Sequence, residues 1–457
     1  MTLDAQSPAI AAAFSVLDAQ LAAEQVARKI PGLAAGVVFD QELVWSKGYG
    51  FANVEKQIPA DANSVYRVAS ITKLFTSTMM MILRDEGRLN LDDPVEKYLP
   101  AFQIKSRFPG ARPITFRQLA AHASGIPREG SHVRWKTMDM PTIDELLASL
   151  AELECIYPTM HEPKYSNLGI AILGHTLSVI AGQPYHQFVS ERIHKPLGMA
   201  SSGYHRDRYG DDRYAVGYYW ARRGQLAAAP HWDEQGFMPG GGMYSTVADI
   251  ARFISLQFRD GEAGGAQILS GSTLREMHSP VLIGQDFEMA YGIAWRMRRL
   301  AGYKSMGHSG GLPGWSTNIT LIPSLKIAAI AFANTGIDPD AISAAMLETL
   351  IPVVKRAAAN GQKLTPEQIA ALQRYIGQYY WLTRDEPAEI RIFNDALIFG
   401  GFGAPPNTFV TLIPHDENRF LMKGGSSDGE LAIFETDDVG NVTGLMLGAY
   451  PLIKVND

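Results

Sequence analysis

The chain has 457 residues, of which 46% are hydrophobic and 19% charged, and its formal net charge is −6. These values are typical of a globular protein, and the length gives a soft expectation of two or three domains. The acidic balance argues against a nucleic-acid partner, because such proteins usually carry a basic face, and gives no support for a membrane surface. With Cys155 as the single cysteine an internal disulfide is excluded, and we expect no metal site and no cofactor.

The first element in chain order is an amphipathic helix. Ile10, Phe14, Leu17 and Leu21 recur at helical spacing. The segment lacks the basic start of a secretory signal, since its first charged residue is Asp4. The most apolar later run, LFTSTMMMIL, is too short to span a bilayer. We therefore predict a cytoplasmic protein, with a periplasmic location as the alternative if a leader precedes this sequence.

A hairpin and a second helix are predicted next. Two β-rich runs, residues 33–39 and 42–53, flank Asp40-Gln41, which is typical of an antiparallel hairpin. A helix then begins near Ser70 and ends around Gly87, because glycine suits the position just after a helix.

Strands return after a helical middle. Short helices and loops rich in Pro and Gly extend to about residue 235, and residues 244–258 have helical periodicity. The runs YGIAWRMR, STNITLIP and KIAAIAFANT predict three successive strands, closed by a helix over residues 338–358. This order predicts an α+β fold, in which an antiparallel sheet is covered by helices and carries a helical subdomain.

The C-terminal part differs in character. Residues 356–367 are polar and contain a Gly and a Pro, which predicts a linker between a domain of residues 1–355 and one of residues 368–457. Six short, regularly spaced strand candidates follow: AEIRIFND, ALIFGGF, TFVTLIPHD, RFLMKGG, LAIFETDD and VTGLMLGAY. They predict a small β-barrel.

Ser70-Ile71-Thr72-Lys73 is an S-x-x-K motif at the start of a predicted helix. Positions i and i+3 share a helix face, so the Ser70 hydroxyl and the Lys73 amine can meet. The helix N-terminus favours a developing oxyanion, and the apolar flanks would lower the pKa of Lys73 toward that of a neutral base. The alternative for these residues alone is a serine cap with an exposed lysine one turn on.

Two further short motifs contain polar groups. Tyr165 and Asn167, in YSNLG, project the same way from an extended loop and can hand over a proton and hold a substrate carbonyl. The triplet His308-Ser309-Gly310 lies between a tight turn and the strand STNITLIP. At a sheet edge, Gly310 and Gly311 would let a ligand approach the backbone. A surface turn and a structural histidine are the alternatives.

In this order, S-x-x-K, Y-x-N and H-S-G resemble the motifs of the serine β-lactamase and penicillin-binding-protein superfamily. The resemblance is closest to the branch of class C β-lactamases, D,D-carboxypeptidases, D-aminopeptidases and lactamase-like esterases, and it covers roughly residues 5 to 355. The stretches EGRLNLDDPVEKYLPAF, ITFRQLAAHASGIP and PGGGMYSTVADIARF also match family patterns. The C-terminal strands resemble the lipocalin-like barrel appended to some D-amino-acid peptidases and peptide-cyclising thioesterases.

This resemblance implies roles for three catalytic groups. Ser70 is the nucleophile that forms an acyl-enzyme, and Lys73 is the base that activates it. Tyr165 relays the proton to the leaving group and later activates water.

The resemblance also implies how the substrate is held. Asn167 binds the acyl side-chain amide, and His308 positions or polarises Tyr165 and the substrate. The backbone N–H groups of Ser70 and Gly311 form the oxyanion hole, with Ser309 and Gly310 on the substrate-binding strand. His308 stands where most class C β-lactamases have a lysine that recognises the β-lactam carboxylate, so efficient lactamase activity is not expected.

The stretch GHSGG also matches the G-x-S-x-G nucleophile elbow, which would make Ser309 the nucleophile. An elbow requires a helix directly after its serine, whereas residues 310–314 read GGLPG and cannot start one. The sequence therefore predicts attack from Ser70.

The predicted function is that of a serine hydrolase acting through a Ser70 acyl-enzyme on small esters or on amide or peptide bonds next to D- or non-standard residues. Two alternatives stay open: an acyltransferase or thioesterase of the penicillin-binding-protein type that ligates or cyclises peptides, and a non-catalytic scaffold that retains the fold. The expected partner is a small-molecule or peptide substrate, with no nucleic acid and no membrane. The sequence leaves the oligomeric state open.

Overall fold

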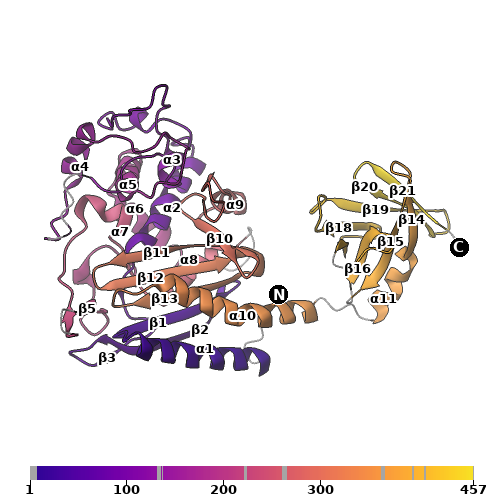
Figure 1. Ribbon diagram of the computed structural model, residues 1–457, viewed down its shortest axis with the longest axis horizontal. Coiled ribbons are helices and arrows are strands. Elements are labelled where there is room, and N and C mark those ends of the chain that lie inside the picture. The colour runs from indigo at the N-terminus through magenta and orange to yellow at the C-terminus, as the bar shows by residue number, and fades with distance from the viewer. Residues whose placement is uncertain are drawn as a thin grey trace. The chain divides into compact units, whose positions relative to one another are not determined.

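The computed structural model describes residues 8–130, 135, 137–220, 224–259, 265–361, 366–393, 396–405 and 408–455. The chain divides into two compact units, residues 2–353 and residues 354–457, each described here by itself (Figure 1). Helix α10 (Pro339–Gly361) contains this division and confirms the predicted final helix. It also covers residues 356–361 of the predicted linker, because the alanine-rich run RAAANG continues the helix.

A nine-stranded antiparallel sheet forms the centre of the first unit, with the order β3-β2-β1-β13-β12-β11-β10-β9-β8. Its strands are β1 (Gly32–Phe39), β2 (Glu42–Asn53), β3 (Ile58–Pro59), β8 (Leu282–Ile283), β9 (Ala290–Tyr291), β10 (Arg296–Leu300), β11 (Tyr303–Leu312), β12 (Trp315–Ile322) and β13 (Ile327–Ala333). The predicted hairpin is confirmed by β1 and β2, and the second and third predicted strands by β12 and β13. Of the first predicted strand, YGIAWRMR, only residues 296–298 lie in β10 and Tyr291 in β9, while residues 292–295, which include a bend, lie between them.

Strand β11 corrects one expectation, because the triplet 308–310 lies inside a strand and not between a turn and a strand. This strand is interior to the sheet, but β10 pairs with it only as far as Gly307, opposite Arg296. From His308 onward β11 pairs with β12 alone, so that half of the strand is an edge.

Helices cover both faces of the sheet (Figure 1). On one face Phe14 of α1 (Pro8–Ala27) stacks on Trp45 of β2, with ring centroids 6.1 Å apart. On the other face α8 (Val247–Gln257) packs so closely that a Cβ on Gly36 would lie 2.6 Å from Val247. Strands β1 and β13 are therefore buried along their whole length, which explains their continuous apolar sequences.

The remaining helices and short strands build the helical subdomain and its junction with the sheet. They are α2 (Thr72–Asp85), α3 (Phe116–Ala120), α4 (Ile143–Ser149), α5 (Asn167–Ala181), α6 (Tyr185–Val189), α7 (Met238–Gly241), α9 (Gly271–Met277), β4 (Tyr66–Arg67), β5 (Tyr218–Trp220), β6 (Leu226–Ala228) and β7 (Tyr244–Ser245). The predicted helix at Ser70 starts as a 3₁₀ turn, η1 (Ala69–Ile71), and ends before Gly87, whose φ is +72°.

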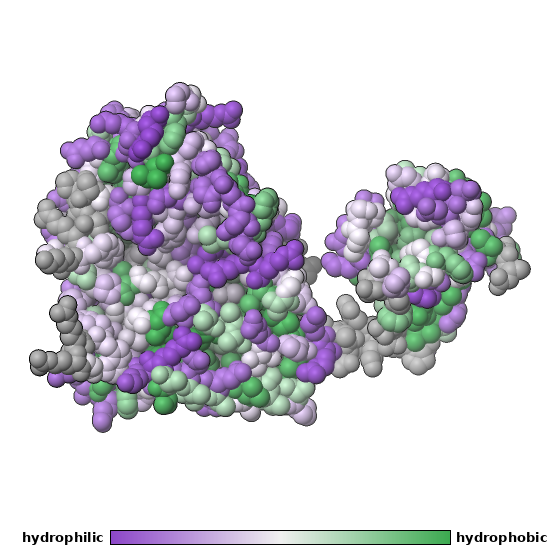
Figure 2. All heavy atoms as spheres, in the orientation of Figure 1, coloured by the Kyte–Doolittle hydropathy of each residue, from purple (hydrophilic) through white to green (hydrophobic). Residues whose placement is uncertain are grey.

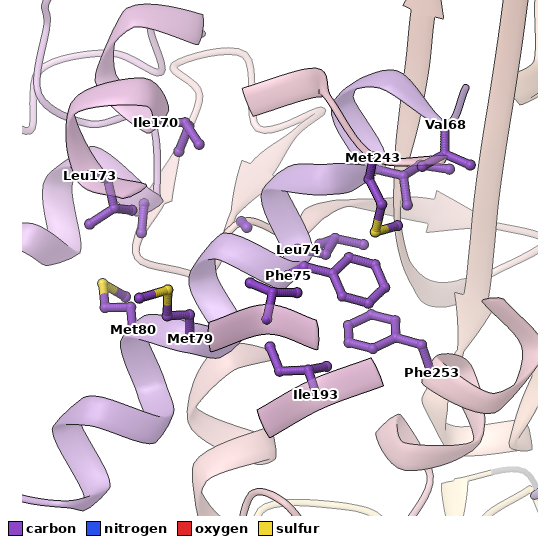
Figure 3. Packing of buried hydrophobic residues seen from close by; sticks show 14 of the residues in the cluster. Val68, Leu74, Phe75, Met79, Met80, Ile170, Leu173, Ile193, Met243 and Phe253 are labelled. Atoms are coloured by element: carbon purple, nitrogen blue, oxygen red, sulfur yellow. The ribbon is translucent and has the colours of Figure 1, made fainter. Parts of the chain in front are cut away.

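Helix α2 lies at the centre of the apolar core, and every residue from Thr72 to Leu83 is buried. Figure 3 shows Met80 toward Leu173 of α5 and Phe75 against Phe253 of α8. The two phenylalanine rings are stacked with centroids 4.3 Å apart. Because α2 is held on all sides, the 3₁₀ turn at its start has a fixed position.

The second unit is a closed barrel of eight antiparallel strands, which confirms the predicted β-barrel. After α11 (Pro366–Leu372) it comprises β14 (Gly377–Trp381), β15 (Glu386–Phe393), β16 (Ala396–Gly401), β17 (Val410–Pro414), β18 (Arg419–Lys423), β19 (Leu431–Thr436), β20 (Val442–Leu447) and β21 (Tyr450–Lys454). The first and last strands were not predicted, and they pair with each other to close the barrel. Apolar side chains such as Tyr379, Leu412 and Phe434 fill its core.

On the face drawn in Figure 2, hydrophilic and hydrophobic residues are interspersed over both units. No helix within the described ranges is long and apolar enough to cross a membrane.

Two adjacent glycines on β11 differ in what surrounds them. A Cβ on Gly310 would lie 2.2 Å from the Val68 carbonyl oxygen and 3.0 Å from the Ala69 Cβ, because β11 passes directly against the turn before Ser70. Thr317 of β12 donates a hydrogen bond to the same Val68 oxygen at 3.0 Å. A Cβ on Gly311 would meet no atom within 4 Å.

We therefore expect Gly310→Ala to lower the free energy of unfolding by about 1–3 kcal/mol, through a backbone clash that no rotamer relieves. Gly311→Ala should change it by less than about 0.5 kcal/mol. Urea unfolding of the two variants measures the difference. Equal stability of the two would contradict the close packing of β11 against η1.

Candidate active site

Ser70 and Lys73 are brought together as the S-x-x-K spacing predicts. The Lys73 Nζ lies 2.9 Å from Ser70 Oγ, across the junction of η1 and α2. Ala69, directly before Ser70, has a φ of 49°, in the left-handed region that non-glycine residues rarely adopt. Its carbonyl accepts a hydrogen bond from the Thr72 hydroxyl at 2.6 Å, which helps to hold this turn.

The environment of Lys73 favours its neutral form. Its side chain is fully buried, and burial lowers the pKa from 10.5 to about 7, while Glu129 and Glu234 act in the opposite direction. The Nζ also donates to the Gly240 carbonyl oxygen of α7 at 2.5 Å. Held between Ser70 and Gly240, the amine is oriented toward the serine hydroxyl and has a pKa near neutrality.

The segment that carries Gly240 is fastened to the strand before Ser70. Glu234 Oε1 accepts hydrogen bonds from Arg67 Nη2 of β4 at 2.8 Å and from Trp232 Nε1 at 3.0 Å. The Arg67 guanidinium lies over the Trp232 ring, 4.1 Å from its centroid, and both charged groups are buried. Separating a buried ion pair would leave two unpaired buried charges, which is energetically costly. The pair of Arg67 and Glu234 therefore constrains the position of the segment that leads into α7.

Tyr165 lies beside Lys73, which the sequence spacing alone does not predict. The Lys73 Nζ is 5.2 Å from the centroid of the Tyr165 ring. Burial raises the pKa of the phenol to about 12, and a hydrogen bond with Ser70 partly opposes this shift. The His122 ring packs against Tyr165 with centroids 4.4 Å apart, and its Nδ1 accepts a hydrogen bond from the Ser166 backbone at 3.2 Å. His122 therefore packs against the Tyr165 ring and has a structural role.

His308 is neutral in this environment. Burial lowers its pKa to about 3, with Lys73 and Arg296 acting in the same direction. Its Nδ1 is 2.7 Å from the Ser309 carbonyl oxygen and must donate to it, which leaves a lone pair on Nε2. The Nε2 is buried without a hydrogen-bond partner in the described part of the chain, and the ring centroid is 6.1 Å from that of Tyr165.

Asn167 corrects a detail of the prediction. It is the first residue of α5, whose N-cap is Ser166, and not part of an extended loop. Its Nδ2 donates to Glu129 Oε1 at 2.6 Å. Burial raises the pKa of Glu129, whereas the Asn167 hydrogen bond lowers it.

Two cavities share Ser70, Arg128 and Gly311 as lining residues. The larger, about 360 Å³, is also lined by Tyr165, His308 and Ser309. The smaller, about 80 Å³, includes Asn167 among its lining residues. Gly310 lines neither cavity, because the position of its absent side chain faces η1.

Sequence reasoning missed the charged groups around this centre. Arg67, Glu129 and Glu234 lie far apart in the chain and belong to no motif, so no spacing signal pointed to them. Arg128 was also missed, and its guanidinium stands 5.0 Å from the centroid of the Tyr165 ring. Within the described residues, no group of three or more His, Cys, Asp or Glu side chains is placed to hold a metal ion.

Comparison with known proteins identifies the family of the chain. The sequence profile of the family described as Beta-lactamase matches residues 17–351, so the chain belongs to the Beta-lactamase family. Beta-lactamase-like protein 2 of Dictyostelium discoideum is 32% identical over 365 residues, covering 78% of this chain and 65% of that protein. The chain therefore spans slightly less than two thirds of that relative. Putative beta-lactamase-like 1 of Homo sapiens is 28% identical over 364 residues, covering 77% of this chain and 70% of that protein.

Solved structures show the same fold. The octameric penicillin-binding protein homologue from Pyrococcus abyssi is 26% identical with a TM-score of 0.67, over 96% of this chain and 100% of that one. The D-stereospecific amidohydrolase from Streptomyces sp. is 25% identical with a TM-score of 0.61, over 73% of this chain and 98% of that one.

The pKa values of the site predict a single ionisation near neutral pH. For an uncharged ester, kcat/KM should rise about tenfold per pH unit below pH 7 and level off above it, because Lys73, with a pKa of about 7, must lose its proton. Tyr165, with a pKa of about 12, stays protonated, and His308, with a pKa of about 3, stays neutral. A pH–rate profile measures this, and a midpoint above pH 9 would contradict the assignment.

Proposed function

We propose that the protein is a serine hydrolase that forms an acyl-enzyme on Ser70 and acts on small esters or on amide bonds next to D- or non-standard residues. The observation that carries this proposal is the buried amine of Lys73, 2.9 Å from Ser70 Oγ and with a pKa lowered to about 7. A base whose pKa lies near the working pH is unprotonated in a large fraction of the molecules and still binds a proton strongly. A non-catalytic scaffold would gain nothing from a buried amine with a lowered pKa beside a serine hydroxyl.

In the acylation step the neutral Lys73 amine accepts the proton of Ser70 as Oγ attacks the substrate carbonyl carbon. The carbonyl oxygen becomes an oxyanion that receives hydrogen bonds from the backbone N–H groups of Ser70 and Gly311, which line both cavities. Each such donor contributes about 3 kcal/mol of transition-state stabilisation. Collapse of the tetrahedral intermediate breaks the bond to the leaving group.

Tyr165 is placed to move protons on the leaving-group side. Its phenol contacts Ser70 and lies beside Lys73, so a proton taken from the serine can pass through Lys73 and Tyr165 to the departing oxygen or nitrogen. In deacylation a water molecule donates a proton along the same route in reverse and attacks the acyl carbon, which regenerates Ser70.

His308 narrows the range of substrates. With a pKa of about 3 it offers an uncharged acceptor where a lysine would offer a permanent cation. A β-lactam carboxylate therefore has no lysine partner at this position. A neutral ester or amide carries no carboxylate, so the absence of a lysine removes no contact with it. The similarity to a D-stereospecific amidohydrolase supports amides as substrates.

A fluorophosphonate probe tests the nucleophile. We expect the adduct on Ser70, and Ser70→Ala should abolish both labelling and hydrolysis of p-nitrophenyl esters, a loss of about 10³-fold or more. Peptide mapping by mass spectrometry locates the adduct.

Ser309→Ala is the matched control, because Ser309 also lines the larger cavity. This variant should remain labelled at Ser70 and retain a good part of the activity. An adduct on Ser309 in the wild-type protein, or full activity of Ser70→Ala, would overturn the proposal.

A further inference from the structure

The helical turn that carries Gly240 has little conformational preference of its own. Helix α7 has only four residues, and three glycines in a row, residues 240–242, follow Pro239. Glycine loses more conformational freedom on folding than any other residue, so such a run does not keep one conformation by itself. The Gly240 carbonyl oxygen nevertheless has a defined place, because it accepts the hydrogen bond from Lys73. Contacts from other elements must therefore fix this turn.

Helix α2 supplies two of these contacts, one on each side of Lys73. Thr76 Oγ1 donates a hydrogen bond to the Pro239 carbonyl oxygen at 2.6 Å. Thr72 Oγ1 accepts a hydrogen bond from the Met243 backbone N–H at 3.2 Å. Because residues three and four positions apart are neighbours on a helix surface, these side chains meet one segment together. The lysine beside Ser70 is thus flanked by two threonines that hold the chain around Gly240.

The hydroxyl of Thr76 departs from the usual behaviour of a threonine inside a helix. Such a hydroxyl commonly donates to the carbonyl oxygen one turn back. Thr78, two positions further on, does this with Leu74 at 2.8 Å. For Thr76 the corresponding oxygen, that of Thr72, is 3.5 Å away, at the limit of a hydrogen bond. The short hydrogen bond of Thr76 therefore leaves α2 and ends on α7.

A chain of buried hydroxyls supports this direction. Tyr204 donates to the Tyr185 hydroxyl at 3.1 Å, and the hydroxyl oxygens of Tyr185 and Thr76 are 2.8 Å apart. Each hydroxyl has a single hydrogen. Because Thr76 uses its hydrogen on Pro239, Tyr185 must donate to Thr76, and every hydroxyl of the chain donates toward α7. Hydrogen bonds that run in one direction polarise one another, which strengthens the last of them.

Helix α5 holds the turn against α2. A Cβ on Gly174 of α5 would lie 2.2 Å from the Pro239 Cβ and 3.5 Å from the Thr76 Cγ2. Thr76 and Pro239 therefore pack together at a place where α5 has no side chain. The carbonyl of Pro239 shares its peptide plane with the Cα of Gly240. A hydrogen bond that fixes this carbonyl thus also fixes where Gly240 begins.

The Gly240 carbonyl has two effects on the Lys73 amine. When one N–H of the neutral amine donates to this oxygen, rotation about the Cε–Nζ bond is restricted and the lone pair can point to the Ser70 hydroxyl, 2.9 Å away. The same oxygen also stabilises the protonated amine, because hydrogen bonds from charged donors are stronger than those from neutral ones. Loosening the contact should misalign the base and also lower its pKa.

We propose that Thr76 is a positioning residue for the acylation step. It holds the Pro239 carbonyl, and the neighbouring Gly240 carbonyl then orients the Lys73 amine. Thr76 lines neither of the two cavities at Ser70, so it acts through these groups and not on the substrate. This inference rests on the proposed Ser70 hydrolysis and adds to it the side chain that aims the base.

Thr76→Val tests the inference, because valine has nearly the shape of threonine but cannot donate to Pro239. We expect kcat/KM for a p-nitrophenyl ester, which is determined by acylation, to fall about tenfold because the base is misaligned. The midpoint of the pH–rate profile should move to lower pH by about half a unit, because the Lys73 ammonium loses part of its stabilisation.

The other titratable and charged side chains around the amine keep their identity in this variant, so a shifted midpoint reports the contact of Lys73 itself. They are Arg128, Glu129, Glu234, Tyr165, His122 and His308.

Thr78→Val is the matched control, because it makes the same substitution on the same buried helix and removes a hydroxyl that bonds to Leu74 of that helix. It should leave kcat/KM within about twofold of the wild-type value and the midpoint unchanged. Thr76→Ser keeps the donor and should restore the wild-type midpoint with most of the activity. Thermal unfolding checks that each variant folds.

The midpoint decides the outcome. An unchanged midpoint in a folded Thr76→Val, or the same shift in Thr78→Val or in Thr76→Ser, overturns the positioning role. If Thr76→Val does not fold, Tyr185→Phe is measured instead, because it removes the donor that directs the Thr76 hydrogen to Pro239. A shift to lower pH in that variant supports the role, and a wild-type profile overturns it.

Failure of the proposed function gives a different result. Absence of Ser70 labelling and of hydrolysis in the wild-type protein contradicts the proposed hydrolysis itself. In that case an NMR titration of the Lys73 amine in the wild-type protein and in Thr76→Val still measures the shift. A lower pKa in the variant supports the contact through Gly240, and equal pKa values overturn it.

Discussion

Burying a lysine amine without a direct carboxylate partner is unfavourable while the amine keeps its proton. Lys73 is buried completely, and its hydrogen-bonding neighbours among the described residues are a serine hydroxyl and a backbone carbonyl, both uncharged. The protein relieves this cost by lowering the pKa of the amine to about 7. The same constraint that destabilises the charged form thus creates a base beside Ser70.

The surrounding structure maintains this constraint. Core helix α2 fixes Lys73 from one side, and α7 presents the Gly240 carbonyl from the other. The buried pair of Arg67 and Glu234 ties these two regions together over 167 positions of sequence. Gly310 allows β11 to approach the turn that contains Ser70, so its neighbour Gly311 lines both cavities.

The parts of this site that a sequence predicts are the local ones. The spacing of Ser70 and Lys73 is enough to place them on one helical face, and the structure has them in contact. Tyr165, Asn167 and His308 have no such spacing rule, and only the resemblance to a known family connected them. The N-terminal helix was likewise predicted from periodicity, and the β-hairpin from two β-rich runs that flank a turn.

The parts that were not predicted depend on tertiary contacts. Glu129 and Glu234 acquire their importance from a cavity that forms only when distant segments pack, and no local pattern marks them. The steric need for Gly310 arises from Val68, which lies elsewhere in the chain. Helix α10 continues over residues 356–361, the first half of the predicted linker, and no local pattern marked where it ends.

Membership of the Beta-lactamase family accounts for the fold, whereas the choice of reaction depends on the site. The uncharged His308 lines the larger cavity, whereas Glu129 and Glu234 line the smaller one, so the two cavities differ in electrostatic character.

The charge state of Lys73 is the central claim, and it can be observed directly. A ¹⁵N NMR titration of lysine side-chain amines, assigned by loss of one signal in Lys73→Met, gives the pKa of this group without substrate. We predict a midpoint near pH 7, in line with the pKa of about 7 that burial imposes. A midpoint close to the ordinary lysine value of 10.5 would contradict the account, because Lys73 would then be charged at neutral pH and unable to accept the proton of Ser70.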